Sequence, residues 1–110
     1  MFLEDGPIGW TKRPASMENV QDAYGIYMVG DSMEPRYYQG WLLHVNPKKP
    51  PARRRDVVVY KQGNGVLIKE FVGWREDTLV LRQLNPEKEI MVQRSDIREV
   101  HLIVGSDQES

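Results

Sequence analysis

DVVVYKQGNGVLIKEFVGW, residues 56–74, is the stretch that decides the fold class. Its two ends, residues 56–61 and 66–74, are rich in Val, Tyr, Phe and other residues typical of strands. The residues between them, 62–65, include an Asn-Gly pair, which favours the tight turn of a β-hairpin. The stretch therefore predicts two antiparallel strands joined by a turn.

Similar runs, each bounded by turn residues, lie on both sides of this hairpin. They cover residues 23–30, 41–45, 78–84, 89–93 and 100–105. Short strands separated by frequent turns predict an all-β fold, a meander or small barrel with little helix. Two of these runs, 78–84 and 100–105, alternate poorly between apolar and polar residues, which suits either a central strand or burial in a dimer interface.

The start of the chain has a different texture. Residues 1–21 contain two glycines and two prolines and show no sustained period, so they predict an extended lead-in or linker segment. Residues 22–110 then form the predicted domain, which is the size of one ordinary domain. Within it, Asp31 as an N-cap and Glu34 three residues later predict a short helical turn that starts at Asp31.

Composition excludes several classes of function. Fifteen Lys and Arg against sixteen Asp and Glu give a net charge of -1, which argues against a protein that binds nucleic acid with its whole surface. The absence of cysteine excludes disulfide scaffolds, thiol catalysis and Cys-ligated metal clusters. The acidic residues are dispersed, so we expect no metal and no cofactor. No apolar run has the length of a membrane span, and we expect a cytoplasmic protein without a membrane partner.

The sequence GDSMEP, residues 30–35, offers a candidate nucleophile. A serine at a tight turn after a strand projects beside backbone N–H groups that lack partners, so it supplies a hydroxyl and a candidate oxyanion hole together. A Gly-Asp-Ser tripeptide is more commonly a polar turn in which Asp31 or Ser32 caps a helix. The distinction depends on whether the chain offers a base.

Three residues are candidates for that base. His44 and His101 lie in predicted strands among apolar neighbours, where a histidine is more often satisfied by a hydrogen bond than catalytic. Lys69 stands in VLIKEFV, where alternation places it on one face with Leu67 and Phe71. Burial there would lower the pKa of the lysine and make it a general base, whereas on a solvent face it would be an ordinary surface residue.

These residues also match a family. VGDSMEP at 29–35, followed 37 residues after Ser32 by Lys69 in LIKEF, resembles the C-terminal domain of LexA and the phage repressors, the S24-type Ser-Lys peptidases. The resemblance extends over about residues 13–105 and implies a mainly β, LexA/signal-peptidase-like domain. It further implies that Ser32 is the nucleophile, that a neutral Lys69 is its base, and that backbone N–H groups near Ser32 and Met33 hold the oxyanion.

The resemblance also implies a biological role. Members of the family form homodimers and cleave their own chain, stimulated after DNA damage by a RecA filament on single-stranded DNA. The cut separates the dimerisation domain from an N-terminal helix-turn-helix domain that binds DNA. This chain departs from the pattern in two respects: it contains no Ala-Gly or Cys-Gly pair of the kind the family cleaves, and nothing before Asp22 has the period of a helix-turn-helix. We therefore expect it to be the C-terminal part of a repressor whose DNA-binding half lies elsewhere.

Four other readings stay open at this stage. The same domain without catalysis would only dimerise or sense an effector. A signal-peptidase-like enzyme would share the Ser-Lys chemistry but needs a membrane anchor. A small barrel that binds single-stranded nucleic acid would use exposed aromatic residues, and the candidates are Trp10, Trp41, Trp74, Tyr37, Tyr38 and Tyr60. The basic loop at 46–55 would contact phosphates or an acidic partner if it is more than a solvated loop; its cations are Lys48, Lys49, Arg53, Arg54 and Arg55.

Overall fold

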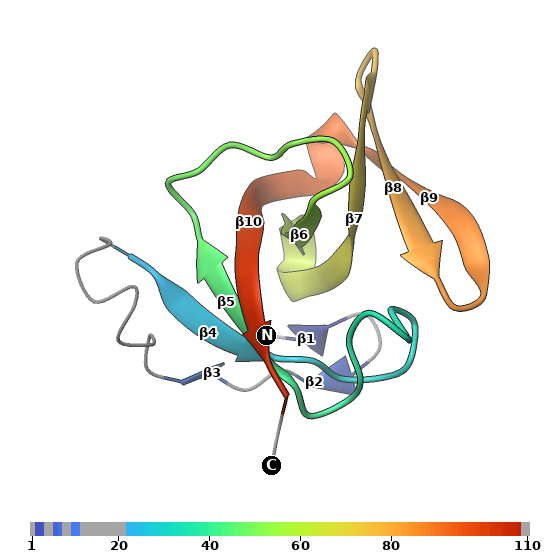
Figure 1. The fold of residues 1–110 in the computed structure, drawn as a ribbon. Helices are drawn as coiled ribbons and strands as arrows, with labels where there is room; N and C mark the ends of the chain where they lie inside the picture. Colours follow the sequence, from blue (N-terminus) through green and yellow to red (C-terminus); the bar gives the residue numbers. More distant parts are fainter. Residues whose placement is uncertain (1, 4–5, 8–9, 12–21, 109–110) are drawn as a thin grey trace.

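Ten strands and two short 3-10 turns make up the described part of the chain (Figure 1). The computed structural model describes residues 2–3, 6–7, 10–11 and 22–108. The strands are β1 (Phe2–Leu3), β2 (Gly6–Pro7), β3 (Trp10–Thr11), β4 (Tyr24–Tyr27), β5 (Leu42–Asn46), β6 (Asp56–Lys61), β7 (Gly65–Arg75), β8 (Thr78–Leu84), β9 (Glu87–Gln93) and β10 (Ile97–Asp107); the 3-10 turns are η2 (Gln62–Asn64) and η3 (Arg94–Asp96). None of these residues is in an α-helix, which confirms the all-β prediction.

The sheet is built around β7, β6, β10 and β5, which are neighbours in that order. The predicted hairpin at 56–74 is the β6–β7 pair, in which Val58 lies opposite Ile68. Strand β10 pairs antiparallel with both β5 and β6, and β8 pairs with both β7 and β9. The continuous apolar character of 78–84 and 100–105 therefore has an explanation within the chain, since both strands have a neighbour on each side.

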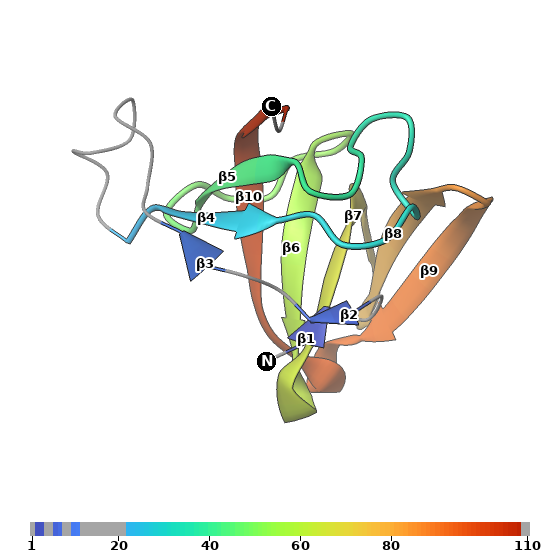
Figure 2. The same cartoon turned by 90° about the horizontal axis from the view of Figure 1, so that it is seen from below.

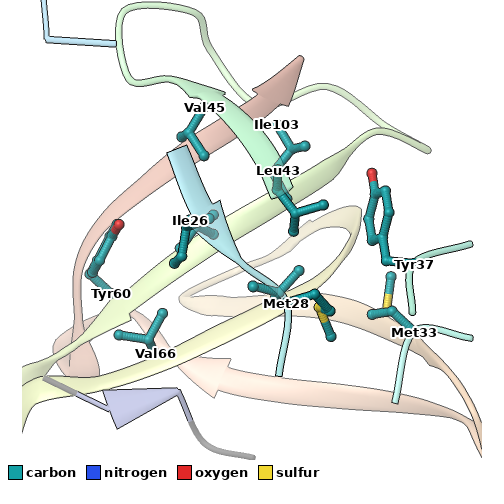
Figure 3. Packing of buried hydrophobic residues seen from close by; sticks show 11 residues of the cluster. Ile26, Met28, Met33, Tyr37, Leu43, Val45, Tyr60, Val66 and Ile103 are labelled. Atoms are coloured by element: carbon teal, nitrogen blue, oxygen red, sulfur yellow. The ribbon is translucent and has the colours of Figure 1, made fainter. Parts of the chain in front are cut away.

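Two hydrophobic clusters occupy opposite faces of the β6–β7 pair, because successive side chains of a strand point to opposite faces. The first cluster lies between this pair and β4–β5 (Figure 3) and includes Ile26, Met28, Met33, Tyr37, Leu43, Val45, Val58, Tyr60, Val66, Ile68 and Ile103. The second lies toward the β8–β9 hairpin and includes Val57, Val59, Leu67, Phe71, Leu79, Leu81, Val92 and Leu102. Burial on both faces explains why Val57, Val58 and Val59 are all fully buried.

The short strands near the start of the chain pair with the rest of the sheet. β1 pairs parallel with the beginning of β7, and β3 pairs antiparallel with β4 (Figure 2). Of the predicted lead-in segment at 1–21, residues 1, 4–5, 8–9 and 12–21 lie outside the described residues, so its extended character stays a prediction. The domain boundary at residue 21 stays a prediction.

The loop between β4 and β5 carries the GDSMEP sequence and differs from the expected helical turn. The N–H of Glu34 donates to the carbonyl of Asp31 at 3.1 Å, which closes a β-turn. Residues 32–36 form turns that include a bond from the N–H of Tyr37 to the carbonyl of Met33 at 3.1 Å, and no helix follows Asp31. Gly30 has a φ of 85°, a left-handed conformation that glycine adopts without strain. The loop is fixed from inside by Met33, which is fully buried in the first cluster.

Candidate active site

The structure brings Ser32 and Lys69 together. Lys69 Nζ lies 3.0 Å from Ser32 Oγ and is placed to donate a hydrogen bond to it. Ser32 is 5% exposed and Lys69 is 2% exposed. Two residues 37 positions apart thus form a contact that is shielded from water.

Strand β7 fixes the position of Lys69. Lys69 lies opposite Val57 on β6 and shares its face with Leu67 and Phe71, as the alternation predicted. The lysine therefore lies on the face of β7 that carries residues of the second hydrophobic cluster. Burial of an amine in apolar surroundings favours its neutral form, which is the form able to accept a proton.

The tip of the β8–β9 hairpin fastens the serine loop from the other side, and Figures 1 and 2 show the loop reaching toward the end of β8. The N–H groups of Leu84 and Asn85 both donate to the carbonyl of Ser32, at 3.1 and 2.8 Å. The side-chain amide of Asn85 donates to the carbonyl of Asp31 at 3.0 Å. Asn85 could not be singled out from the sequence, because the NPEK stretch that contains it indicates only a turn.

These hydrogen bonds also orient the backbone of the loop. The carbonyls of Asp31, Ser32 and Met33 all accept hydrogen bonds, the last of them from the N–H groups of Arg36 and Tyr37. Among the backbone hydrogen bonds of the described residues, none uses the N–H of Met33. The oxyanion role of the N–H groups at Ser32 and Met33 stays a prediction.

A second polar cluster lies next to the Ser32–Lys69 pair. We call it the Asp56 cluster, and it consists of Arg36, Tyr37, Asp56 and Glu70. Arg36 donates to Asp56 Oδ1 at 2.5 Å, and its other terminal nitrogen lies 3.1 Å from Glu70 Oε1. The hydroxyl of Tyr37 donates to Asp56 Oδ2 at 2.6 Å. Both oxygens of a carboxylate that is only 6% exposed thus have a partner from the serine loop.

Burial dominates the electrostatics of this cluster. Desolvation raises the pKa of Asp56 above its ordinary value, although the hydrogen bond from Tyr37 and the charge of Arg36 act in the opposite direction. Desolvation also raises the pKa of Tyr37, with a further contribution from the charge of Asp56. The pKa of Arg36 is raised: burial alone would lower it, and the charges of Asp56 and Glu70 outweigh that effect. Tyr37 and Arg36 therefore stay protonated as donors to Asp56.

An open pocket lies beside the serine loop. Its volume is about 430 Å³, and it is lined by Pro35, Arg36, Arg82, Leu84 and Glu87. Pro35 and Arg36 follow Ser32 in the loop, and Leu84 bonds to the carbonyl of Ser32, so the pocket adjoins the candidate nucleophile.

The two histidines have other partners. His44 Nε2 lies 2.8 Å from Asp107 Oδ2, and His101 bonds to the Tyr24 hydroxyl at 2.7 Å and to Glu99 at 3.0 Å. Both rings thus form hydrogen bonds with residues of the strands β4 and β10. Of the three candidate bases, Lys69 is the one whose side chain bonds to Ser32.

The aromatic residues and the basic loop that were candidates for nucleic-acid binding lie in different parts of the structure. Trp74 stacks on Arg94, whose guanidinium carbon lies 4.0 Å from the ring centre. Tyr38 packs against Trp41, and their ring centres are 5.5 Å apart. Tyr37 and Tyr60 are buried in the first cluster, and the side chain of Trp10 lies outside what the structure describes. The five cations of the 46–55 loop are exposed, as in a solvated loop.

The described residues include neither a metal-binding cluster nor a membrane-spanning helix. They contain no group of three or more His, Asp or Glu residues arranged to hold a metal ion. None of their helical segments has the length and hydropathy needed to cross a bilayer.

The comparison with known proteins agrees with this geometry. The family described as Peptidase S24-like matches residues 7–105. The chain belongs to this family. Repressor protein C of Rhizobium phage 16-3 is 42% identical over 99 residues, which are 83% of this chain and 38% of that protein. The chain thus spans less than half the length of that relative, and no solved structure matches it. The predicted resemblance to the C-terminal domain of LexA and the phage repressors is confirmed.

Proposed function

We propose that this S24-like domain is the C-terminal regulatory domain of a transcriptional repressor and that its Ser32–Lys69 pair cleaves a peptide bond of the repressor itself. The single observation that carries the proposal is the 3.0 Å contact between the buried Lys69 amine and the Ser32 hydroxyl. A serine hydroxyl is a poor nucleophile until a base removes its proton, and this contact places a base at the hydroxyl.

In the proposed reaction, neutral Lys69 takes the proton of Ser32 as Oγ attacks the scissile carbonyl carbon. The negative charge that develops on the carbonyl oxygen is stabilised by backbone N–H groups at Ser32 and Met33. The C–N bond then breaks, and the Lys69 ammonium returns its proton to the leaving amine. A water molecule, deprotonated by Lys69, hydrolyses the resulting ester and regenerates the serine. General-base catalysis of this kind contributes about 10²- to 10⁴-fold.

The partners follow from the same proposal. The domain dimerises, the complete repressor binds DNA through a helix-turn-helix domain, and a RecA filament on single-stranded DNA stimulates the cut in the cytoplasm. Support comes from the family match and from the phage repressor relative. The 110 residues contain no Ala-Gly or Cys-Gly pair, so the substrate bond is either elsewhere in the repressor or of another sequence.

The test uses the complete protein that carries this chain, as wild type and as Ser32→Ala. Both are incubated from pH 7 to 10 with and without RecA filaments and analysed by intact mass, and their sedimentation is measured. We expect the wild type to split into two fragments and Ser32→Ala to stay whole, with both forms dimeric. Dimers that never split would favour the second candidate, a domain that only dimerises or senses an effector.

A further inference from the structure

The Asp56 cluster connects the serine loop to the strands that carry the lysine. We propose that Asp56 is a positioning residue: through Arg36 and Tyr37 it holds the loop of Ser32 against β7, so that Oγ stays within reach of Lys69. This inference rests on the proposed function of the Ser32–Lys69 pair. It assigns a role to residues that take no part in the proton transfers described above.

The connection between Ser32 and the cluster is short. The N–H groups of Arg36 and Tyr37 donate to the carbonyl of Met33 at 2.9 and 3.1 Å, so the backbone from Ser32 to Tyr37 is closed by its own hydrogen bonds. The side chains of Arg36 and Tyr37, at the end of this segment, donate hydrogen bonds to the two carboxylate oxygens of Asp56. The loop therefore cannot shift relative to β6 without breaking a buried hydrogen bond.

The register of the hairpin carries this constraint to Lys69. Asp56 lies opposite Glu70, and the next pair along the two strands is Val57 and Lys69. Arg36 also contacts Glu70 at 3.1 Å, so the loop is tied to both strands one register pair away from Lys69, whose own side chain points to the opposite face of the hairpin. A shift of the loop by about 1 Å would lengthen the contact between Oγ and Nζ, and misplacement of that size lowers reaction rates by up to about 100-fold.

Stability alone does not account for the cluster. Asp56 and Glu70 are 6% and 7% exposed, and burial of carboxylates carries a large desolvation cost even when they are paired. Apolar residues of similar volume at such positions are often as stable or more stable. The charged cluster fixes the position of the serine loop through directional hydrogen bonds, which apolar side chains would not form.

The test compares two tyrosine variants that make the same chemical change. Tyr37→Phe removes the hydroxyl that donates to Asp56, and Tyr60→Phe removes a hydroxyl of similar burial that bonds to Tyr24. The measurement is the rate at which a fluorophosphonate labels Ser32, corrected for the folded fraction measured by urea unfolding. We expect Tyr37→Phe to label about tenfold more slowly than wild type, on the scale of one hydrogen bond to a charged group, and Tyr60→Phe to stay within about twofold.

Two variants of Arg36 provide a second comparison in the same labelling assay. Arg36→Met should slow labelling by up to about 100-fold, and Arg36→Lys, which keeps the charge near Asp56, should recover part of that loss. If Tyr37→Phe and Tyr60→Phe label at the same corrected rate while the wild type is reactive, the positioning role is wrong and the proposed catalytic pair stands. If folded wild type is never labelled, the proposed function fails and the positioning role fails with it.

Discussion

Replacement of Lys69 by methionine is expected to stabilise the fold while it removes the reactivity of Ser32. Lys69 is 2% exposed, and burial of a polar group costs about 1–3 kcal/mol in mutational data. The hydrogen bond to Ser32 at 3.0 Å, which the variant loses, contributes about 1 kcal/mol. Methionine fills a similar volume, so the free energy of unfolding should rise by about 0–2 kcal/mol.

The gain should depend on pH. The proposed mechanism requires a neutral Lys69 in the folded protein, whereas an unfolded lysine binds a proton below about pH 10.4. The unfolded state of the wild type therefore binds the additional proton, and the stability of the wild type rises with pH over this range. The advantage of Lys69→Met should consequently be larger at pH 6 than at pH 9.

Urea unfolding of the wild type and Lys69→Met at these two pH values measures the effect. Lys61→Met is the matched control, because Lys61 lies on the adjacent strand β6, is 24% exposed and pairs with Asp96 at 3.5 Å. An ion pair of this kind contributes about 0–1 kcal/mol, so the control should lose a little stability equally at both pH values. A loss of more than about 2 kcal/mol in Lys69→Met, equal at pH 6 and 9, would refute the reasoning, because it would mean that Lys69 is a stabilising cation.

Three further predictions concern the loop, the buried tyrosines and the second cluster. Asn85→Ala removes the hydrogen bond to the Asp31 carbonyl, so it should slow labelling of Ser32 about tenfold and lower the free energy of unfolding by about 1 kcal/mol or less. Unchanged labelling would show that the hairpin tip does not hold the loop. Burial raises the pKa of Tyr60 to about 12, so the unfolded state ionises first and stability should fall as pH rises from about 10 to 12; ultraviolet titration that shows every tyrosine ionising near pH 10 in the folded protein would contradict this. Leu81→Ala should cost about 2–5 kcal/mol in urea unfolding because Leu81 is fully buried, and a smaller loss would place it at the surface.

The strands could be predicted from the sequence because their signals are local. β6 and β8 begin and end at the predicted residues, since charged residues precede each run and the turn sequences QGNG and NPEK follow them. The turn after Gly30 was predicted less well. Asp31 and Glu34 have the spacing of a capping box, but a capping box stabilises a helix only where a helix follows, and here the chain turns back into the core at Met33.

The candidate site could be predicted only in part. The chemistry of Ser32 and the alternation around Lys69 indicated the pair, yet the 3.0 Å contact depends on how a loop folds onto a strand 37 residues away. The Asp56 cluster was missed altogether. In the sequence, Asp56 is only the first residue of a predicted strand and Glu70 only the residue after Lys69, because cross-strand pairing at 56 and 70 follows from register and not from composition.

The measurement that tests the central claim most directly is labelling of Ser32 by a fluorophosphonate, followed by intact mass from pH 6 to 10. It compares the wild type with Ser32→Ala and Lys69→Ala and needs no peptide substrate. A buried Ser-Lys pair predicts one adduct on Ser32, formed faster as pH rises through a single transition and absent from both variants. Folded wild-type protein that stays unlabelled at every pH, or Lys69→Ala that labels as fast as the wild type, would contradict the claim.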